Sequence, residues 1–148
     1  MLKNIPPIIS PELLKILNEM GHGDEIVIAD GNFPAVTNAQ RLIRLDGHNV
    51  PEVLKAILLV LPLDTYVKNA VGLMEVVPGD DVVPTIWEDY KKILNESEEV
   101  FGEFEFIEGF EFYKRASEAF AVVATSELAL YANIILKKGV ISFWYYFQ

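Results

Sequence analysis

The 148-residue chain has no cysteine, only two histidines, and fewer basic than acidic residues. Without cysteine there is no disulfide, no thiol nucleophile and no cysteine-bound zinc. Twelve Lys and Arg stand against 22 Asp and Glu, which gives a net charge of −10. That charge argues against nucleic acid and against anionic membrane surfaces, since both attract clustered basic side chains. It is compatible with a partner that is a neutral small molecule.

Long apolar runs are also missing. Runs such as residues 57–61 are far too short to span a bilayer, and no basic region followed by an apolar stretch opens the chain. We therefore expect no membrane segment and no secretory signal, and a cytoplasmic location by default. Hydrophobic residues make up 51% of the chain. This fraction predicts a well-packed core, and it predicts further apolar surface that subunit interfaces would cover.

Several catalytic motifs are absent as well. The chain has no G-x-S-x-G elbow, no G-x-x-x-x-G-K-[ST] loop and no G-x-G-x-x-G loop, which argues against a serine hydrolase and against phosphate-binding loops of these types. Two scattered histidines argue against a structural zinc site. The pair Asp80-Asp81 follows Pro78-Gly79 and is better explained as an exposed turn than as a calcium site.

Helix and strand patterns alternate along the chain with short connections between them. Apolar residues at helical spacing predict helices over residues 11–20, 50–61, 84–99 and 110–120. Apolar and β-branched runs predict strands over residues 26–29, 41–46, 71–77, 104–107, 121–125 and 133–140. This order predicts an α/β fold: one domain over residues 1–148, with a mixed, mostly parallel β-sheet flanked by helices in three layers.

The last eight residues, 141–148, form an aromatic extension with the sequence ISFWYYFQ. Free in water, so many aromatic side chains would make a sticky patch. We expect the segment to pack on a subunit interface or to close over a binding site. A strand that completes the sheet edge is an equal alternative.

Residues 19–35, EMGHGDEIVIADGNFPA, have the features of a small site. A helix that begins after Ser10 is predicted to end at Gly21 as a left-handed cap, which leaves His22 in a loop between two glycines. The charge of histidine changes near neutral pH, and loops on a rigid scaffold suit chemistry. A loop histidine is more often structural than catalytic, so the residues alone leave both roles open.

Asp30 closes the predicted buried strand 26–29. Ligands of open α/β sheets gather at the carboxyl ends of strands, so Asp30 is placed to bind a ligand or to orient His22. An aspartate before a glycine is also a common turn-former, and the two interpretations are equal on the residues alone.

The tripeptide Tyr131-Ala132-Asn133 is the third candidate element. If it is extended, the side chains of Tyr131 and Asn133 leave the same face and that of Ala132 leaves the other. A phenol and an amide at that spacing suit neighbouring hydroxyl groups. Packing of Tyr131 at a core edge and turn-capping by Asn133 is the plainer alternative.

Together, several segments of the chain resemble a known protein family. Residues 19–35 and the segment YANIILKKGV at residues 131–140 are similar to the sugar mutarotase family of L-fucose mutarotase and D-ribose pyranase. The opening MLK and the segment ISPELL at residues 9–14 resemble the fucose branch more closely. The similarity runs along most of the chain and fades in the last eight residues, and its separated motifs in the right order make it specific.

The resemblance implies a D-ribose pyranase-like fold with His22 as the general acid/base. It implies that Asp30, Tyr131, Asn133 and the backbone of Ala132 bind the sugar. The implied reaction interconverts the α and β anomers of a free monosaccharide, with L-fucose favoured, and needs neither metal nor cofactor. Relatives form rings, commonly homodecamers. A D-ribose pyranase-type activity and a non-catalytic sugar-binding role on the same scaffold are the alternatives.

Two positions depart from the family's pattern. Gly109 stands where the fucose branch has an arginine and the ribose branch a histidine, so one polar sugar contact is missing and the identity of the sugar is in question. Glu108 and Glu111 are the nearby side chains that would compensate. Asn32 stands where members of the fucose branch often have histidine.

The spacing of His22 and Asp30 bears on assembly. Four or five extended residues between them span roughly 15 Å at about 3.3 Å per residue, which is much more than one pyranose ring. Either the His22 loop folds back or the two residues serve sites on different subunits. We predict that each site is completed by a neighbouring chain.

Overall fold

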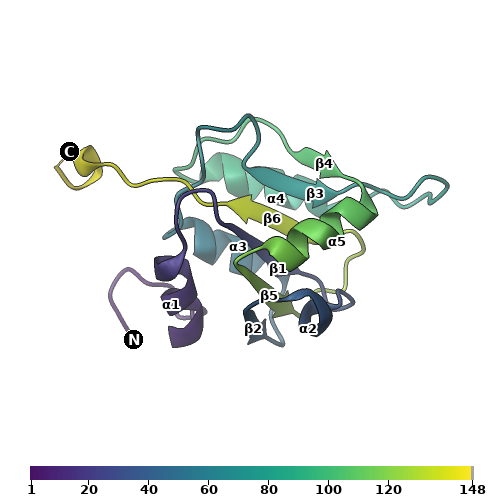
Figure 1. The fold of residues 1–148 in the computed structure, drawn as a ribbon, viewed down its shortest axis with the longest axis horizontal. Helices are drawn as coiled ribbons and strands as arrows, with labels where there is room; N and C mark the ends of the chain where they lie inside the picture. The colour runs from purple at the N-terminus through teal and green to yellow at the C-terminus, as the bar shows by residue number, and fades with distance from the viewer. Residues whose placement is uncertain (148) are drawn as a thin grey trace.

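The computed structural model describes residues 1–147 and is built on a six-stranded sheet (Figure 1). The strands are β1 (Glu25–Ala29), β2 (Leu42–Leu45), β3 (Val71–Met74), β4 (Glu105–Ile107), β5 (Ala121–Thr125) and β6 (Ile134–Lys137). Their order in the sheet is β2-β5-β1-β6-β3-β4. All pairs are parallel except those of β6, which runs antiparallel to both β1 and β3. The prediction of a mixed, mostly parallel α/β sheet is confirmed.

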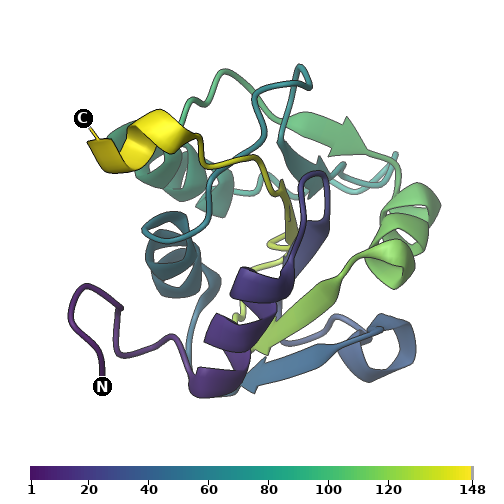
Figure 2. The same ribbon diagram turned by 60° about the vertical axis from the view of Figure 1, so that its left-hand side comes forward.

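Helices cover both faces of this sheet. They are α1 (Pro11–Glu19), α2 (Ala35–Asn38), α3 (Val50–Leu58), α4 (Ile86–Glu96) and α5 (Gly109–Glu118), followed by the 3₁₀ helix η1 (Phe143–Phe147). The buried side chains of α1, α3 and α4 belong to one core cluster, and those of α2 and α5 belong to a second. Figure 2 shows α3 on one side of the sheet and α5 on the other. The sheet therefore lies between two layers of helices, in the predicted three-layer arrangement.

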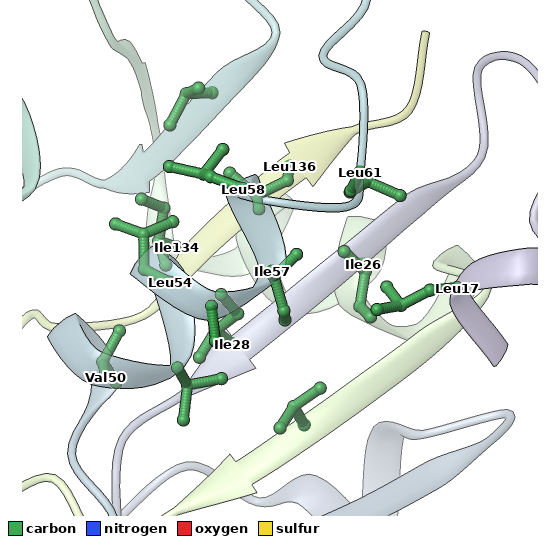
Figure 3. Packing of buried hydrophobic residues seen from close by; sticks show 14 of the residues in the cluster. Leu17, Ile26, Ile28, Val50, Leu54, Ile57, Leu58, Leu61, Ile134 and Leu136 are labelled. Carbon is green, nitrogen blue, oxygen red and sulfur yellow. The ribbon is translucent and has the colours of Figure 1, made fainter. Parts of the chain in front are cut away.

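Strand β1 contributes to both layers of the core. Its side chains alternate, so Ile26 and Ile28 enter the cluster under α3 while Val27 and Ala29 enter the cluster under α5. All four are fully buried. Figure 3 shows Ile26 and Ile28 beneath Ile57 of α3. The prediction that this short apolar run is a strand buried on both faces is confirmed.

The start of α1 is as predicted, but its end is not. Ser10 caps the helix, because its Oγ accepts the N–H of Leu13 at 3.2 Å. At the other end Met20 is extended and Gly21 is not left-handed; the left-handed residue is Gly23, with φ 86°. The expected cap at Gly21 is therefore wrong, and the His22 loop turns at Gly23 instead.

Other differences concern the lengths of elements. The four-residue helix α2 was not predicted, because one helical turn is too short to show a period in the sequence. The last strand spans Ile134–Lys137 rather than residues 133–140. The residues of η1 form a 3₁₀ helix that stands clear of the sheet in Figure 1, so the alternative of an edge strand is wrong there. Within residues 1–147 no helix is both long and apolar enough to cross a bilayer.

A close backbone approach at Gly139 gives a stability prediction. A Cβ at this position would lie 2.5 Å from the carbonyl oxygen of Leu63 and 2.7 Å from its carbonyl carbon. Because the obstacle is backbone, we expect Gly139→Ala to lower the free energy of unfolding by about 1–3 kcal/mol, the usual cost of overpacking. Urea denaturation at fixed protein concentration measures this. The matched control is Gly102→Ala, where a Cβ meets no atom within 4 Å; equal losses in both variants would contradict the prediction.

Candidate functional site

Asp30 lies at the sheet edge where the five parallel strands end. Its residue surface is 7% exposed, and its backbone N–H donates to Oδ1 of Asn133 at 2.7 Å. Its Oδ1 accepts the N–H of Asn32 at 2.9 Å, which forms a turn. The structure therefore brings Asp30 and Asn133 together, as the two residues that join the end of β1 to the start of β6. The turn-forming role of Asp30 is also present.

Different neighbours of the Asp30 carboxyl shift its pKa in opposite directions. Burial raises the pKa of Asp30 and is the largest effect, while backbone N–H groups at Asn32, Phe33 and Ala132 lower it and the charge of Glu127 raises it. The net result is a raised pKa. A buried carboxyl lined by N–H donors is a suitable partner for hydroxyl groups.

Tyr131 lies near this edge but not as predicted. Its φ of 56° is left-handed, so the tripeptide is not extended, and the condition for placing both polar side chains on one face is not met. The Tyr131 hydroxyl donates to Oδ2 of Asp80 at 2.7 Å and accepts the N–H of Val77 at 3.2 Å. The hydrogen bond to Asp80 is the main reason that the pKa of Tyr131 is raised. Sequence reasoning treated Asp80 only as a turn residue and missed this contact.

Two side chains of α4 hold the backbone of this tripeptide. Nε1–H of Trp87 donates to the carbonyl of Tyr131 at 2.8 Å, and the hydroxyl of Tyr90 donates to the carbonyl of Ala132 at 2.6 Å. Tyr90 is fully buried, and burial raises its pKa strongly. Because the tripeptide backbone is held from α4, Asn133 keeps its place beside Asp30 despite lying outside β6.

His22 lies at the opposite edge of the sheet, in the loop between α1 and β1. Its Nε2 is 3.0 Å from Oδ1 of Asp64, and its ring lies against Tyr66 with centroids 5.3 Å apart. The side chain of His22 is 45% exposed, whereas that of Asp64 is 3% exposed. One ring nitrogen is thus held by a buried carboxylate, while part of the ring remains accessible.

Asp64 stays charged although it is buried. Burial raises its pKa, but the N–H of Tyr66, the hydrogen bond and charge of His22, and the charge of Lys137 together outweigh that effect, so the pKa of Asp64 is lowered. Sequence reasoning missed both Asp64 and Tyr66. The only signal was Pro62, which ends the preceding helix and places Asp64 in a loop; the approach of this loop to His22 cannot be read from the sequence.

The central strands separate the group around His22 from the group around Asp30. Gly23 N–H donates to the carbonyl of Lys138 at 2.8 Å, just beyond the end of β6, whereas Asp30 meets Asn133 at the start of β6. His22 and Asp30 therefore lie at opposite ends of the pair β1–β6, and the five residues of β1 alone span roughly 16 Å. Within one chain, the His22 loop does not fold back to Asp30.

The two positions that depart from the family pattern leave space rather than a replacement. A Cβ at Gly109 would meet no atom within 4 Å. Oε2 of Glu108 accepts the N–H of Glu111 at 3.1 Å and so caps α5. Asn32 is exposed beside Asp30. Among residues 1–147, no group of three or more His, Cys, Asp or Glu side chains is placed to hold a metal ion.

The three-layer fold, with buried polar groups at one sheet edge and an accessible His–Asp pair at the other, defines an α/β protein suited to binding a small polar molecule. Comparison with known families makes this specific. The chain belongs to the RbsD / FucU transport protein family, whose model matches residues 3–141. The resemblance to the sugar mutarotase family is confirmed.

Individual relatives are similar over nearly their whole length. The fucose mutarotase of Homo sapiens is 50% identical over 147 residues, which cover 95% of both chains. The L-fucose mutarotase of Actinobacillus pleuropneumoniae is 47% identical over 140 residues, 95% of this chain and 97% of the other. The crystal structure of the Streptococcus pneumoniae fucose mutarotase in complex with L-fucose superposes with a TM-score of 0.90 at 50% identity, over 95% of this chain and 100% of that one. The expected likeness to the fucose branch is confirmed.

The lowered pKa of Asp64 predicts how its contribution to stability varies with pH. The carboxyl binds protons less readily in the folded than in the unfolded chain, whose aspartate pKa is about 3.9. Its contribution is therefore present above about pH 4 and is lost as the pH falls through the lowered folded pKa. We expect Asp64→Asn to reduce the free energy of unfolding at neutral pH and the difference from the unaltered chain to shrink below about pH 4.

Urea denaturation between neutral and acid pH checks this prediction. The control is Asp46→Asn, because Asp46 is exposed and pairs with Arg44 at the surface, where ion pairs contribute little. A difference for Asp64→Asn that stays constant down to the acid limit would contradict the expected linkage.

Proposed function

We propose that this chain is a fucose mutarotase that interconverts the α and β anomers of free L-fucose. The observation that carries the proposal is the similarity to fucose mutarotases at about half of all positions, over nearly the whole length of both chains. A relative of the same fold and similar identity has been solved with L-fucose bound. The His22–Asp64 pair supplies the acid/base chemistry that such a reaction requires.

The hydrogen bond between His22 and Asp64 has a definite direction. An ionised carboxylate only accepts hydrogen bonds, so Nε2 of His22 carries the proton that points at Asp64. In the neutral ring Nδ1 then carries the lone pair, free to take a proton from a sugar hydroxyl. The buried negative charge of Asp64 stabilises the imidazolium that forms and holds the ring in place. In this proposal Asp64 acts as the positioning residue and His22 as the catalytic residue.

At the other edge, four residues would hold the sugar. The Asp30 carboxylate accepts hydrogen bonds from sugar hydroxyl groups, and the amide nitrogen of Asn133 donates one, since its Oδ1 already accepts the N–H of Asp30. The Tyr131 hydroxyl has one lone pair left after its contacts with Asp80 and Val77. The backbone of Ala132 completes the set.

The reaction needs only proton transfers. A base removes the proton of the anomeric hydroxyl while an acid protonates the ring oxygen, and the bond from the anomeric carbon to that oxygen breaks. The open-chain aldehyde rotates about its carbon–carbon bond, and the reverse steps close the ring as the other anomer. No electrons are gained or lost, so the reaction needs no redox cofactor. Because the uncatalysed reaction is already fairly easy, acid/base help and positioning suffice.

The positions of these groups favour an assembly in which subunits share sites. His22 and Asp30 lie too far apart in one chain to reach the same pyranose. We infer that the histidine edge of one subunit faces the Asp30 edge of the next. A closed ring, such as the homodecamer that the resemblance implies, would bring every pair of edges together.

Replacing the histidine tests the enzyme directly. We expect His22→Ala to lower catalysed anomer exchange of L-fucose by about 10²–10⁴-fold, because general acid/base catalysis contributes on that scale. Saturation-transfer NMR between the two anomeric protons measures the exchange. His48→Ala is the matched control, since His48 is also 3.0 Å from a carboxylate, that of Glu52, and is about as exposed. Undiminished exchange in His22→Ala would refute the assignment, and sugar binding without exchange in the unaltered chain would favour a binding protein.

Mixing two inactive variants tests the shared site. We expect His22→Ala and Asp30→Asn chains, each inactive alone, to regain exchange after they are unfolded together and refolded, because some interfaces then join an intact histidine edge to an intact Asp30 edge. The control mixture pairs His22→Ala with Asp64→Asn, whose defects lie on the same edge, and should regain none. Equal recovery in both mixtures, or none in either, would contradict sites shared between subunits.

A further inference from the structure

The C-terminal segment is not accounted for by the proposed reaction. The family match ends at residue 141, just before the five consecutive aromatic residues of η1, which we call the aromatic tail (residues 143–147). Each of these five residues is between 55% and 74% exposed. In Figure 1 the tail stands off from the sheet at the end of an extended connection. A cluster of this kind in water marks an interaction surface.

The tail is organised as a compact aromatic unit. Phe143 and Phe147 stack one helical turn apart, with centroids 4.5 Å apart and planes 24° from parallel. Trp144 meets Phe143 edge to face at 5.3 Å. The N–H of Tyr145 donates to the carbonyl of Ser142 at 3.1 Å and begins the helical turn. The tail therefore presents its aromatic side chains as one contiguous apolar surface.

A groove of about 640 Å³ lies beside the tail, between the ends of α3 and α4. Leu59, Val60 and Pro62 line one side, Ile93 lines another, and Ile141 and Tyr145 close it on the side of the tail. Leu59 is 68% exposed there. Two lysines and three glutamates line the groove as well, so it carries both apolar and charged side chains, and the base of the tail forms one of its walls.

We propose that the aromatic tail of one chain docks in this groove on a second copy of the chain, which returns its own tail. The exchange is reciprocal because both surfaces adjoin one another on every copy. It fastens copies together through a segment that lies outside the family match, and it does not depend on the sugar chemistry.

The areas involved suit a second copy. A buried aromatic side chain covers about 150–250 Å², so the exposed parts of five such residues amount to on the order of 600 Å² per tail. Two tails, with the two grooves that they cover, exceed the roughly 1,200 Å² that specific interfaces bury. A lipid surface fits less well. The tail has no basic residue, and the groove beside it carries three glutamates against the two lysines Lys55 and Lys92, in a chain of net charge −10.

Analytical ultracentrifugation over a dilution series tests the proposal. The samples are the full chain, a chain that ends after Ile141, the double variant Phe143→Ser/Phe147→Ser, and the groove variant Leu59→Glu. We expect each altered chain to dissociate at a concentration at least about tenfold higher than the full chain, equivalent to about 1.4 kcal/mol. Combining the tail and groove changes should add little to either alone, because they remove the same contact. The matched control is Val36→Ser, which alters an apolar residue of α2 that is 73% exposed.

The fluorescence of Trp144 separates docking on a second copy from other fates of the tail. The difference in emission between the full chain and Trp144→Phe isolates this residue from Trp87. We expect its emission to be blue-shifted at high concentration and to move to longer wavelength on dilution. Blue-shifted emission at every concentration would mean that the tail folds onto its own chain and would overturn the proposal. Unchanged dissociation in all tail variants, or binding of the tail to phosphatidylcholine vesicles without any effect on mass, would overturn it as well.

Discussion

The antiparallel pairing of β6 with β1 and β3 is the constraint on which the rest of the structure depends. It inserts a reversed strand among parallel ones, so β6 begins at the edge where the other five strands end and ends at the edge where they begin. At its start, Asn133 holds the backbone of Asp30; just past its end, the carbonyl of Lys138 accepts the N–H of Gly23 beside His22. One short strand thereby supports both groups of polar residues and sends the C-terminal segment out from the histidine edge.

The two edges are built differently, in keeping with the different roles proposed for them. At the Asp30 edge the polar groups are buried and held by backbone contacts, and Trp87 and Tyr90 of α4 secure the carbonyls of Tyr131 and Ala132. Such a surface suits selection of a hydroxylated ligand, because every fixed donor or acceptor costs affinity when it is left unpaired. At the other edge, a half-exposed histidine is held by one buried carboxylate. That arrangement suits a group that must gain and lose a proton while it remains reachable.

The aromatic tail adds a third surface to the same molecule. Because β6 ends at the histidine edge, whatever covers the tail also lies on that side of the sheet. The tail therefore does not cover the Asp30 edge of its own chain. This separation lets association through the tail change without a change in the residues proposed to hold the sugar.

Much of the fold could be predicted from local patterns. Apolar runs and helix signals located all six strands and the four longer helices to within a few residues, because each pattern reflects the burial of its own segment. The positions of His22 after a helix and of Asp30 after a strand followed in the same way. The left-handed turn at Gly23 rather than Gly21, and the conformation of Tyr131, did not, because both depend on hydrogen bonds to distant parts of the chain.

The sequence by itself determined the class of fold, the buried strand at its centre and the polar residues that flank that strand. Only the tertiary structure decided which of these residues meet. Asp64 lies 42 positions from His22, and Asp30 lies 103 positions from Asn133. Such contacts arise from the order and direction of strands in the sheet, which no local periodicity encodes. The same ordering places the end of β6, and with it the aromatic tail, at the histidine edge.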